Sequence, residues 1–356
     1  MRARGFSLVE FMIAMTIGLF LIAGLVYLIA ETSRSRAEIE RSSRQIENGR
    51  YAIDRIAEDL RHVGFLGEYE PAEDATVTLP TTLPSPCATT IAGLDGGPLL
   101  IPIQAYDGGA SVPSALSGCL AAADYQPNTD IVVVRRASTS TIATTGTLVA
   151  NQLYIQTGHG TGAAFERKME TGSNVGTFTL KRYSNNSSVD TTVALLRRYI
   201  VRIYFVSPCN VPSSGVSSDP CDAAADGGTP IPTLKMLELG PGPEFQKLAI
   251  AEGIEQLRFD FGLDGSNGDG VPDCMVRFSD CGGAAVTSGT EIAHWTNIVG
   301  AQVNIVARNS EPSPSYSDDK IYSLGLKGYT AATNDPYRRH AYSAFVRLNN
   351  IAMRRE

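Results

Sequence analysis

A single acidic side chain, Glu10, interrupts an otherwise uncharged apolar run near the start of the chain. The run extends from Phe6 to Ala30, and the short basic segment with Arg2 and Arg4 precedes it. A carboxylate inside an apolar membrane segment costs on the order of a few kcal/mol, and such residues are usually paired and functional. After Gly5, no basic residue stands within one helical turn of this carboxylate. Glu10 is therefore the first candidate for a functional residue.

The apolar run is long enough to cross a membrane as a helix. A helix over Phe6–Ala30 would span about 37 Å, against about 30 Å for the hydrocarbon core of a bilayer. A secretory signal peptide is the alternative, but its apolar region covers only about 7–15 residues and ends at a small-residue cleavage site. Here Glu31-Thr32-Ser33-Arg34 follows instead. Arg2 and Arg4 predict a cytoplasmic N-terminus with the rest of the chain outside the cytoplasm. On hydropathy alone, a plain single-span anchor is the favoured explanation of the run.

The segment Arg4-Gly5-Phe6-Ser7-Leu8-Val9-Glu10 resembles the type III signal of the type IV pilin family. The resemblance implies that a prepilin peptidase cuts between Gly5 and Phe6 and methylates the new amine of Phe6. It also implies that Glu10 acts in assembly. Cleavage creates an α-ammonium group in the membrane, and the carboxylate of a neighbouring subunit can neutralise it. Two unfavourable charges then become one pair that sets the register between subunits.

The helix is predicted to continue beyond the membrane. Apolar residues recur every seven positions, at Ile39, Ile46, Ile53 and Leu60, which is typical of an amphipathic helix. No proline occurs before Pro71, so one helix of roughly 84 Å is predicted from about Phe6 to about Arg61. A coiled coil is one explanation of the stripe. Packing on a sheet, as in pilins, is favoured because a β-rich region follows.

From Gly64 onward, strand-like segments alternate with long loops rich in Gly, Pro and Ser. The predicted strands are Leu99–Tyr106, Asp130–Arg135, Thr147–Thr157, Gly176–Tyr183, Ala194–Val206, residues 255–263, Ile298–Arg308 and Tyr342–Leu348. Their apolar rows are explained by core packing.

The expected fold class is α+β, with the long helix packed on an antiparallel β-sheet domain. The expected division is a leader (1–5), a transmembrane half of the helix (6–30), an amphipathic half (31–63) and a periplasmic or extracellular β-rich domain (64–356). The long loops of that domain are where specificity would be expected.

Six cysteines lie in the part of the chain predicted to be outside the cytoplasm, where thiols are oxidised. They are Cys87, Cys119, Cys209, Cys221, Cys274 and Cys281. Their even number predicts disulfides, and pairing of sequence neighbours (87 with 119, 209 with 221, 274 with 281) is the simplest of fifteen arrangements. A zinc site is the alternative, but the chain has no C-x-x-C motif and its four histidines do not cluster with the cysteines.

An oxygen-rich loop between residues 264 and 273 is a candidate calcium site. Asp264, Asn267, Asp269 and Asp273 are the candidate ligands, and the glycines between them allow tight turning. The loop is similar to the D-x-D-x-D-G loops of EF-hands and thrombospondin-type repeats, although its spacing departs from theirs. An acidic Asn-Gly/Asp-Gly hairpin turn is the alternative.

Charge and motifs weigh against other functions. After residue 62 the chain holds 21 Lys+Arg against 29 Asp+Glu, since nine Arg and eight acidic residues of the total 30 and 37 precede it. An acidic body without a basic stripe argues against nucleic-acid binding. Residues 158–163 fit G-x-G-x-x-G/A but lack a clear βαβ context. The chain has no G-x-S-x-G or H-E-x-x-H motif. We therefore expect no enzyme, and a membrane-anchored periplasmic hydrolase is the alternative from another class.

Within the pilin class, both ends of the chain resemble the PilW family of minor pilins. The resemblance rests on the N-terminal helix, the loop after residue 263, Trp295-Thr296-Asn297-Ile298-Val299, Tyr337-Arg338-Arg339 and residues 344–350. It implies a low-abundance, single-pass inner-membrane subunit that primes pilus assembly and is incorporated near the fibre tip at the cell surface.

The partners that this resemblance implies are other minor pilins and the major pilin, the prepilin peptidase, the inner-membrane assembly platform and a tip adhesin. No cofactor is required apart from the candidate structural Ca²⁺. The J-type minor pseudopilin of type II secretion is related and is the alternative within the class.

Overall fold

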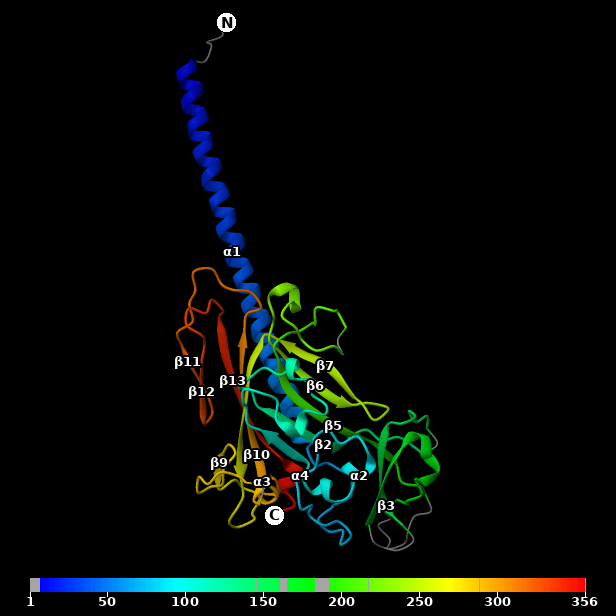
Figure 1. Ribbon diagram of the computed structural model, residues 1–356. Helices are drawn as coiled ribbons and strands as arrows, with labels where there is room; N and C mark the ends of the chain where they lie inside the picture. Colours follow the sequence, from blue (N-terminus) through cyan, green and yellow to red (C-terminus); the bar gives the residue numbers. More distant parts are fainter. Residues whose placement is uncertain are drawn as a thin grey trace.

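The computed structural model describes residues 7–144, 146–160, 165–182, 192–216, 218–287 and 289–355. A single long helix, α1 (Leu8–Arg61), extends from the N-terminal end into a β-rich domain (Figure 1). The first part of α1 stands free of the domain, and its last turns lie inside it. The other helices are one or two turns long: α2 (Ile91–Leu94), α3 (Glu291–Thr296) and α4 (Asn349–Ala352).

A seven-stranded antiparallel sheet forms the larger part of the domain. Its strands are β1 (Ile103–Tyr106), β2 (Ile131–Ala137), β3 (Leu153–His159), β4 (Phe165–Thr171), β5 (Leu196–Ser207), β6 (Thr233–Leu239) and β7 (Phe245–Glu252). The long strand β5 is its centre, because it pairs with β2, with β3 and with β6 along different parts of its length. Strand β7 continues the sheet beyond β6, and β4 continues it beyond β3.

A second antiparallel sheet has the order β13-β10-β8-β9. Its strands are β13 (Arg339–Arg347), β10 (Ile298–Arg308), β8 (Ile254–Leu263) and β9 (Cys274–Val276). A separate hairpin is formed by β11 (Ile321–Leu324) and β12 (Lys327–Thr330). The predicted α+β class, with a long helix and antiparallel sheets, is confirmed.

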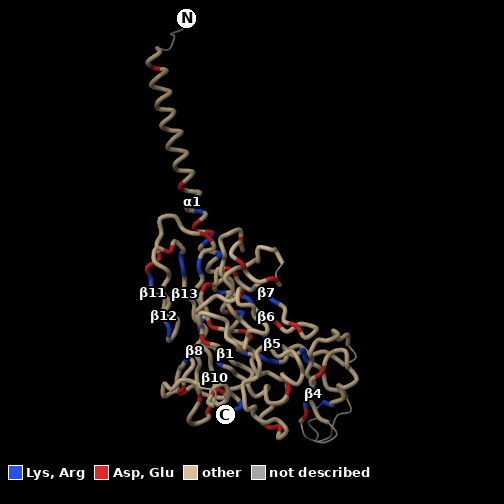
Figure 2. Tube along the Cα trace, viewed as in Figure 1, with Lys and Arg blue, Asp and Glu red and all other residues tan. Residues whose placement is uncertain are grey.

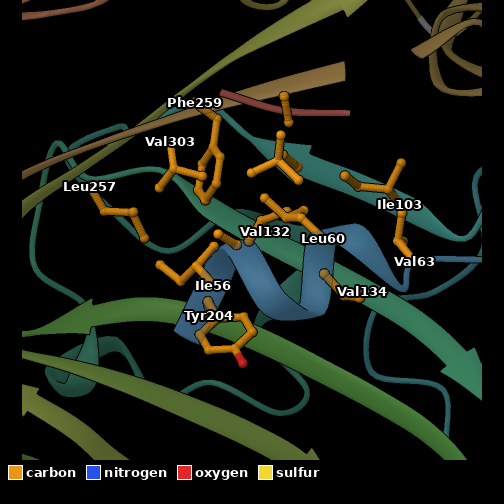
Figure 3. Close-up of a cluster of buried hydrophobic side chains, with 14 of the residues drawn as sticks. Ile56, Leu60, Val63, Ile103, Val132, Val134, Tyr204, Leu257, Phe259 and Val303 are labelled. Atoms are coloured by element: carbon orange, nitrogen blue, oxygen red, sulfur yellow. The ribbon is translucent and has the colours of Figure 1, made fainter. Parts of the chain in front are cut away.

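The last turns of α1 pack between the two sheets rather than on one. Figure 3 shows Ile56 and Leu60 of α1 close to Val132 of the first sheet and to Phe259 of the second. These side chains are at most 1% exposed, and burial of each such side chain contributes roughly 1.5–3 kcal/mol. The heptad stripe predicted from the sequence therefore serves the core of the domain at its C-terminal end.

A buried ion pair fixes α1 to the first sheet. The Asp59 carboxylate accepts hydrogen bonds from Arg136 on β2 and from Arg202 on β5, at 2.8 Å each, and from the Tyr204 hydroxyl. Burial by itself would raise the pKa of Asp59, but the two guanidinium groups and the tyrosine hydroxyl outweigh it and hold this pKa below its ordinary value. Removing one partner of such a buried pair leaves an uncompensated charge.

The opposite face of the first sheet is covered by loops. Apolar residues of β2 and β5 on that face, such as Val133 and Phe205, pack with Leu94, Leu116 and other residues of the segment before β2. This cover lies in the Gly-, Pro- and Ser-rich region that the sequence marked as loops.

Three predicted strands differ substantially from the structure. Thr147–Thr157 is a strand only from Leu153 onward, where β3 begins. In Leu99–Tyr106 only Ile103–Tyr106 is a strand, because Pro98 begins a 3-10 turn and Pro102 has no N–H to donate to a ladder. In Gly176–Tyr183 the described residues contain a 3-10 turn and an isolated bridge at Lys181 instead of a strand, and Tyr183 lies outside the described residues. Six strands were not predicted: β4, β6, β7, β9, β11 and β12.

Candidate functional site

The N-terminal half of α1 presents an apolar surface that nothing in the described chain covers. Sixteen large apolar side chains between Leu8 and Ile29 are each more than half exposed. The most apolar stretch of α1 contains no buried residue, and α1 is the one helix among the described residues that could span a membrane by length and composition. Figure 2 shows the same stretch almost free of charged residues. Such a surface requires lipid or other apolar helices around it.

Glu10 closes the first turn of α1. Ser7 caps the helix by accepting a hydrogen bond from the Val9 N–H through its hydroxyl, and Glu10 in return accepts one from the Ser7 N–H at 2.9 Å. This reciprocal pair is a capping box, which satisfies two of the free amides at a helix start. The predicted processing residues Gly5 and Phe6 lie outside the described residues. The carboxylate of Glu10 therefore lies against the backbone of the residue that directly follows Phe6.

The middle of α1 is held to the domain by polar contacts. Gln45 is buried, and its side-chain amide donates to the carbonyls of Ala307 and Arg338 at 2.6 and 3.0 Å. Glu38 accepts a hydrogen bond from Ser313 at 2.8 Å. These contacts lie C-terminal to the apolar half of α1. The exposed half of the helix therefore projects from a part that is held to the domain. Sequence reasoning missed Gln45 because a lone polar residue on a charged helix carries no distinguishing signal.

A close approach of backbone and ring reinforces the same anchor. A Cβ built on Gly49 would lie 2.3 Å from the ring of Tyr342 on β13. Only glycine lets the strand approach α1 this closely.

Three disulfides staple the loops of the domain. They join Cys87 to Cys119, Cys209 to Cys221 and Cys274 to Cys281, with Cα–Cα distances of 5.5, 5.9 and 5.7 Å. Each one joins sequence neighbours, and the described residues contain no free cysteine.

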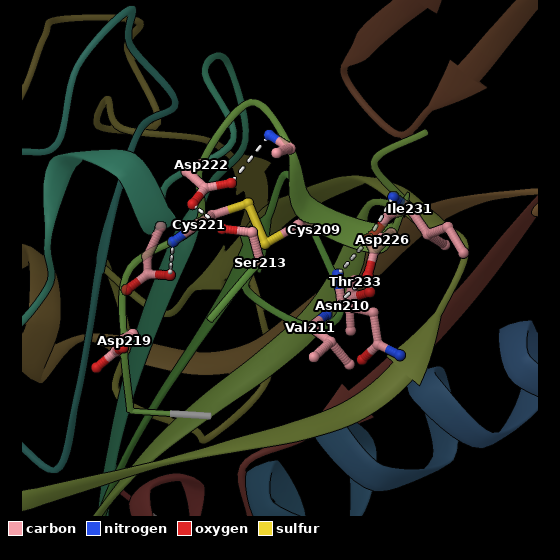
Figure 4. The surroundings of a disulfide bond; sticks show 12 residues. Cys209, Asn210, Val211, Ser213, Asp219, Cys221, Asp222, Asp226, Ile231 and Thr233 are labelled. Carbon is pink, nitrogen blue, oxygen red and sulfur yellow. Dashed lines mark hydrogen bonds between the residues drawn. A yellow bond between two sulfur atoms is a disulfide. The ribbon is translucent and has the colours of Figure 1, made fainter. Parts of the chain in front are cut away.

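Figure 4 shows how one of these loops is held. Beside the Cys209–Cys221 bond, the Asp226 carboxylate accepts hydrogen bonds from the backbone N–H groups of Asn210, Val211 and Ile231. The loop after β5 is therefore fixed by a covalent bond and by one multiply bonded carboxylate.

The candidate calcium ligands lie in one loop but turn their carboxylates toward the loop's own amides. Asp264 accepts from the N–H groups of Gly268 and Gly270 and from Arg355. Asp269 likewise accepts from Asn267 and from the Val271 N–H. Among the residues that the structure describes, no three His, Cys, Asp or Glu side chains gather closely enough to hold a metal ion.

Asp273 follows the same pattern. Its Oδ2 accepts from the N–H groups of Gly265 and Ser266 and from the Ser266 hydroxyl. These bonds hold the pKa of Asp273 below its ordinary value. Calcium would have to displace several amide hydrogen bonds from these carboxylates, so the loop as it stands is a hydrogen-bonded turn and calcium binding stays a prediction.

Comparison with known families agrees with this geometry. The prokaryotic N-terminal methylation motif matches residues 1–26, and type IV pilus-assembly protein W (PilW) matches residues 222–350. No curated protein and no solved structure matches the chain. The methylation motif and the exposed apolar helix together indicate a pilin-like protein anchored in a membrane by α1.

Within that class, the second match is consistent with a minor pilin of the PilW type, the family that both ends of the sequence resemble. It covers strands β6 to β13, and therefore includes the strands of the second sheet that contact α1, which are β8, β10 and β13. Such a protein has a structural part in type IV pilus assembly and interacts with other pilins and with the assembly machinery.

Proposed function

We propose that this protein is a minor pilin that takes part in initiating type IV pilus assembly and is incorporated near the fibre tip. Before assembly it spans the inner membrane once, with its N-terminus in the cytoplasm and its β domain in the periplasm. The proposal rests on one observation above all. The apolar half of α1 is exposed along its length and carries a single charge, Glu10, at its start.

The exposed half of α1 needs a partner surface both before and after assembly. In the membrane, lipid covers its sixteen large apolar side chains. In a fibre, the helices of neighbouring subunits would replace that lipid. Because both environments are apolar, extraction from the membrane exposes little apolar surface to water, and packing and polar pairs decide the association. A charge pair at Glu10 would therefore have a large influence on register.

Glu10 would exchange one partner for a stronger one. In the described residues its carboxylate accepts from the neutral Ser7 N–H. Cleavage between Gly5 and Phe6 would create an ammonium group next to this turn. Charge-assisted hydrogen bonds are about twice as strong as neutral ones. In a fibre, the Glu10 carboxylate would pair with the amine of a neighbouring subunit, whereas in the isolated subunit it would remain in its own capping box.

The shape of the domain supports a position at the tip rather than along the shaft. Figure 1 shows strand β3 far to one side of the α1 axis, and the β11–β12 hairpin on the other. A body that extends sideways in two directions is hard to stack repeatedly around a thin fibre. The proposed partners are the other minor pilins and the major pilin, with the prepilin peptidase, the inner-membrane platform and a tip adhesin.

The test is co-purification from detergent-solubilised membranes, with the unchanged protein compared with Glu10→Ala and with the control Glu31→Ala. Glu31 is also acidic but lies just beyond the apolar run. We expect type IV minor pilins to co-purify with the unchanged protein and with the Glu31→Ala variant. Glu10→Ala should reduce incorporation into fibres by about tenfold or more, if a charge-assisted pair is lost, while leaving the β domain folded.

Two results would redirect the proposal. Recovery of type II secretion pseudopilins would assign the protein to that machine instead. If no pilin of either kind is recovered and deletion leaves surface pili unchanged, the fibre function is wrong and an anchored hydrolase must be reconsidered. Normal assembly of Glu10→Ala in a strain without the native copy would refute only the charge pairing.

A further inference from the structure

The sequence contains two Asn-Gly pairs, and the structure places them in different surroundings. Asn267-Gly268 lies in the loop between β8 and β9, at the end of the domain farthest from the start of α1, whereas Asn48-Gly49 lies inside α1 (Figure 1). In such a pair the backbone nitrogen of the glycine can attack the side-chain amide carbon of the asparagine, because glycine has no Cβ to hinder the approach. The attack is intramolecular, so it needs no enzyme.

Asn267 is open to this reaction. Its side chain is exposed, and Gly268 has a φ of +66°, a left-handed conformation that favours glycine in turns. A Cβ built on Gly268 would have no heavy atom of the described residues closer than 3.9 Å. The turn therefore has room for the backbone rotation that ring closure requires, and water reaches it from outside.

Two carboxylates contact the reacting groups. Asp264 Oδ1 accepts the N–H of Gly268 at 3.0 Å, which is within the reach of a general base for the proton that this nitrogen must lose. Asp269 Oδ2 accepts a hydrogen bond from the side-chain nitrogen of Asn267 at 2.9 Å. Asp264 is buried and is also paired with Arg355, so its carboxylate is fixed in position.

Asn48 is protected from the same reaction. It belongs to α1, where helical hydrogen bonds fix the backbone on both sides, and its side-chain amide donates to the Glu252 carbonyl at 3.1 Å. Gly49 is buried, and the ring of Tyr342 lies 2.3 Å from the position that a Cβ would take. Ring closure at this pair requires local unfolding of the helix. The two pairs therefore have the same local chemistry but different access to it.

We propose that Asn267 is a site of spontaneous deamidation in the folded protein. The Gly268 nitrogen forms a bond to Cγ of Asn267 and gives its proton to Asp264. The bond from Cγ to the side-chain nitrogen breaks, and this nitrogen takes up a proton through water and leaves as ammonia. Water then opens the five-membered imide at either carbonyl, which gives aspartate or isoaspartate at position 267. The proposal does not depend on the assembly function.

The product has one more negative charge, in a loop that already contains Asp264, Asp269 and Asp273. The new carboxylate cannot donate to Asp269, so repulsion between like charges replaces the present hydrogen bond. Deamidation also replaces the neutral member of the candidate calcium ligands by a carboxylate. The modification therefore changes both the charge and the hydrogen bonding of this end of the domain.

The test is incubation of the purified full-length protein in detergent, near neutral pH, in water labelled with heavy oxygen. The protein is then reduced and digested with trypsin in ordinary water, and mass spectrometry locates each deamidated residue. Deamidation before digestion incorporates heavy oxygen, whereas deamidation during digestion does not. Trypsin places Asn48 on the peptide 45–50 and Asn267 on the peptide 259–277, so the two pairs are followed separately. A sample denatured before incubation is the control for the intrinsic reactivity of each pair.

In the denatured sample both pairs should react at comparable rates. In the folded protein we expect labelled aspartate and isoaspartate at position 267, and deamidation at Asn48 that is slower by at least about tenfold, because the helix must first open. Asn267→Gln should leave the peptide 259–277 without deamidation, because the longer side chain cannot form the five-membered imide. The matched control Asn48→Gln should leave the rate at Asn267 unchanged.

Two results would overturn the proposal. One is an intact Asn267 in the folded protein after a time in which the denatured sample has converted, which would mean that the hydrogen bonds of the loop protect it. The other is equal deamidation of Asn267 and Asn48 in the folded protein. Both results come from the unchanged protein, so they do not depend on whether a variant folds. Because the readout is a covalent change at the far end of the domain, its failure leaves the assembly proposal untouched.

Discussion

At the scale of single residues, the side chains that anchor the membrane helix are separate from those that would act in assembly. Asp59 joins α1 to two strands of the first sheet through Arg136 and Arg202. At the other end of the same helix, Glu10 forms a local cap with Ser7. Substitutions at these two acids should therefore have different consequences, one for stability and the other for incorporation into fibres.

Asp59→Ala is expected to destabilise the domain by about 3–5 kcal/mol, because it leaves two arginines buried without their carboxylate. The matched control is Asp54→Ala, an exposed acid on the same helix, which should change stability by less than about 0.5 kcal/mol. Chemical denaturation of the detergent-solubilised protein, followed by circular dichroism, measures both. Similar values for the two variants would contradict the anchoring role of Asp59.

Acid should weaken the domain in two steps with different origins. The pKa of His294 is lowered to about 4 from an ordinary 6.5, so the unfolded chain binds more protons between these values and stability falls as the pH drops through that window. At pH 5 the loss from His294 is about 2 kcal/mol. His294→Phe should remove this part of the pH dependence of the melting temperature measured between pH 7.5 and 5.

The Asp59 contribution is lost at lower pH. Its pKa is lowered in the folded state, so its stabilisation is present above the ordinary value of 3.8 and disappears as the pH falls below it. Below about pH 4, the melting temperature of the Asp59→Asn variant should therefore depend less on pH than that of the unchanged protein. An equal acid response of both proteins would exclude Asp59 as a source.

At the scale of elements, loops carry much of the domain and need covalent support. The segment between Cys87 and Cys119 covers one face of the first sheet, where its leucines pack on β2 and β5. The shorter Cys274–Cys281 loop forms one wall of a cavity beside α3. The Cys87–Cys119 bond therefore stabilises a segment of the core, whereas the Cys274–Cys281 bond stabilises a local surface loop.

Removing the disulfide that closes the longer loop should lower the stability of the domain more than removing the one that closes the shorter loop. The Cys87–Cys119 bond spans 32 residues and the Cys274–Cys281 bond spans 7. Loop-closure entropy predicts losses of about 3.7 and about 2.4 kcal/mol for the paired Cys→Ser variants. Chemical denaturation tests this order, and alkylation with and without reduction, followed by peptide mapping, should find no free thiol in the oxidised protein. A larger loss for the shorter loop would show that native contacts, not chain entropy, dominate.

The loop from Asp264 to Asp273 is expected to bind Ca²⁺ only weakly, because its carboxylates already accept amide hydrogen bonds. At calcium concentrations of about 5 mM, in the range of weak extracellular sites, we expect a small rise in the melting temperature through binding to the folded state. Asp269→Ala should abolish it. The absence of any rise in the unchanged protein would leave the loop as an ordinary turn.

At the scale of the whole molecule, one rigid helix connects two environments. The N-terminal half of α1 exposes apolar side chains that require lipid or other apolar helices around them, and its last turns are enclosed by two sheets. A helix fixed at its base transmits the position of the domain to the membrane or fibre core, so the polar anchors at Gln45 and Asp59 would determine how the domain sits on an assembled fibre.

Processing of the N-terminus is the prediction that belongs to the complete chain. Mature protein is expected to begin at Phe6 with a methylated amine, because Gly5 and Phe6 fall within the matched methylation motif and directly precede the apolar helix. Intact mass spectrometry of membrane-extracted protein measures this. A retained leader, or cleavage near Ala30, would be incompatible with a pilin.

The sequence by itself determined the parts whose signals are local. The long apolar run, the heptad stripe and the lack of proline before Pro71 predicted α1, and the alternation of residues 255–263 predicted β8. These features depend on the periodicity of the helix or strand and on turn residues. Both can be read from residues that are close together in the sequence. The short motif around Gly5, Phe6 and Glu10 could likewise be recognised without knowledge of the fold.

Only the tertiary structure decided which distant residues meet. The Lys, Ala, Leu and Glu residues of β7 favour a helix, yet Phe245–Glu252 is a strand because β6 supplies hydrogen bonds along its edge. Nothing near Asp59 in the sequence indicates Arg136 or Arg202, and nothing near His294 indicates the cavity beside it. Burial and pairing are properties of the packed chain, because the low dielectric that makes such groups matter exists only after the sheets have closed around them.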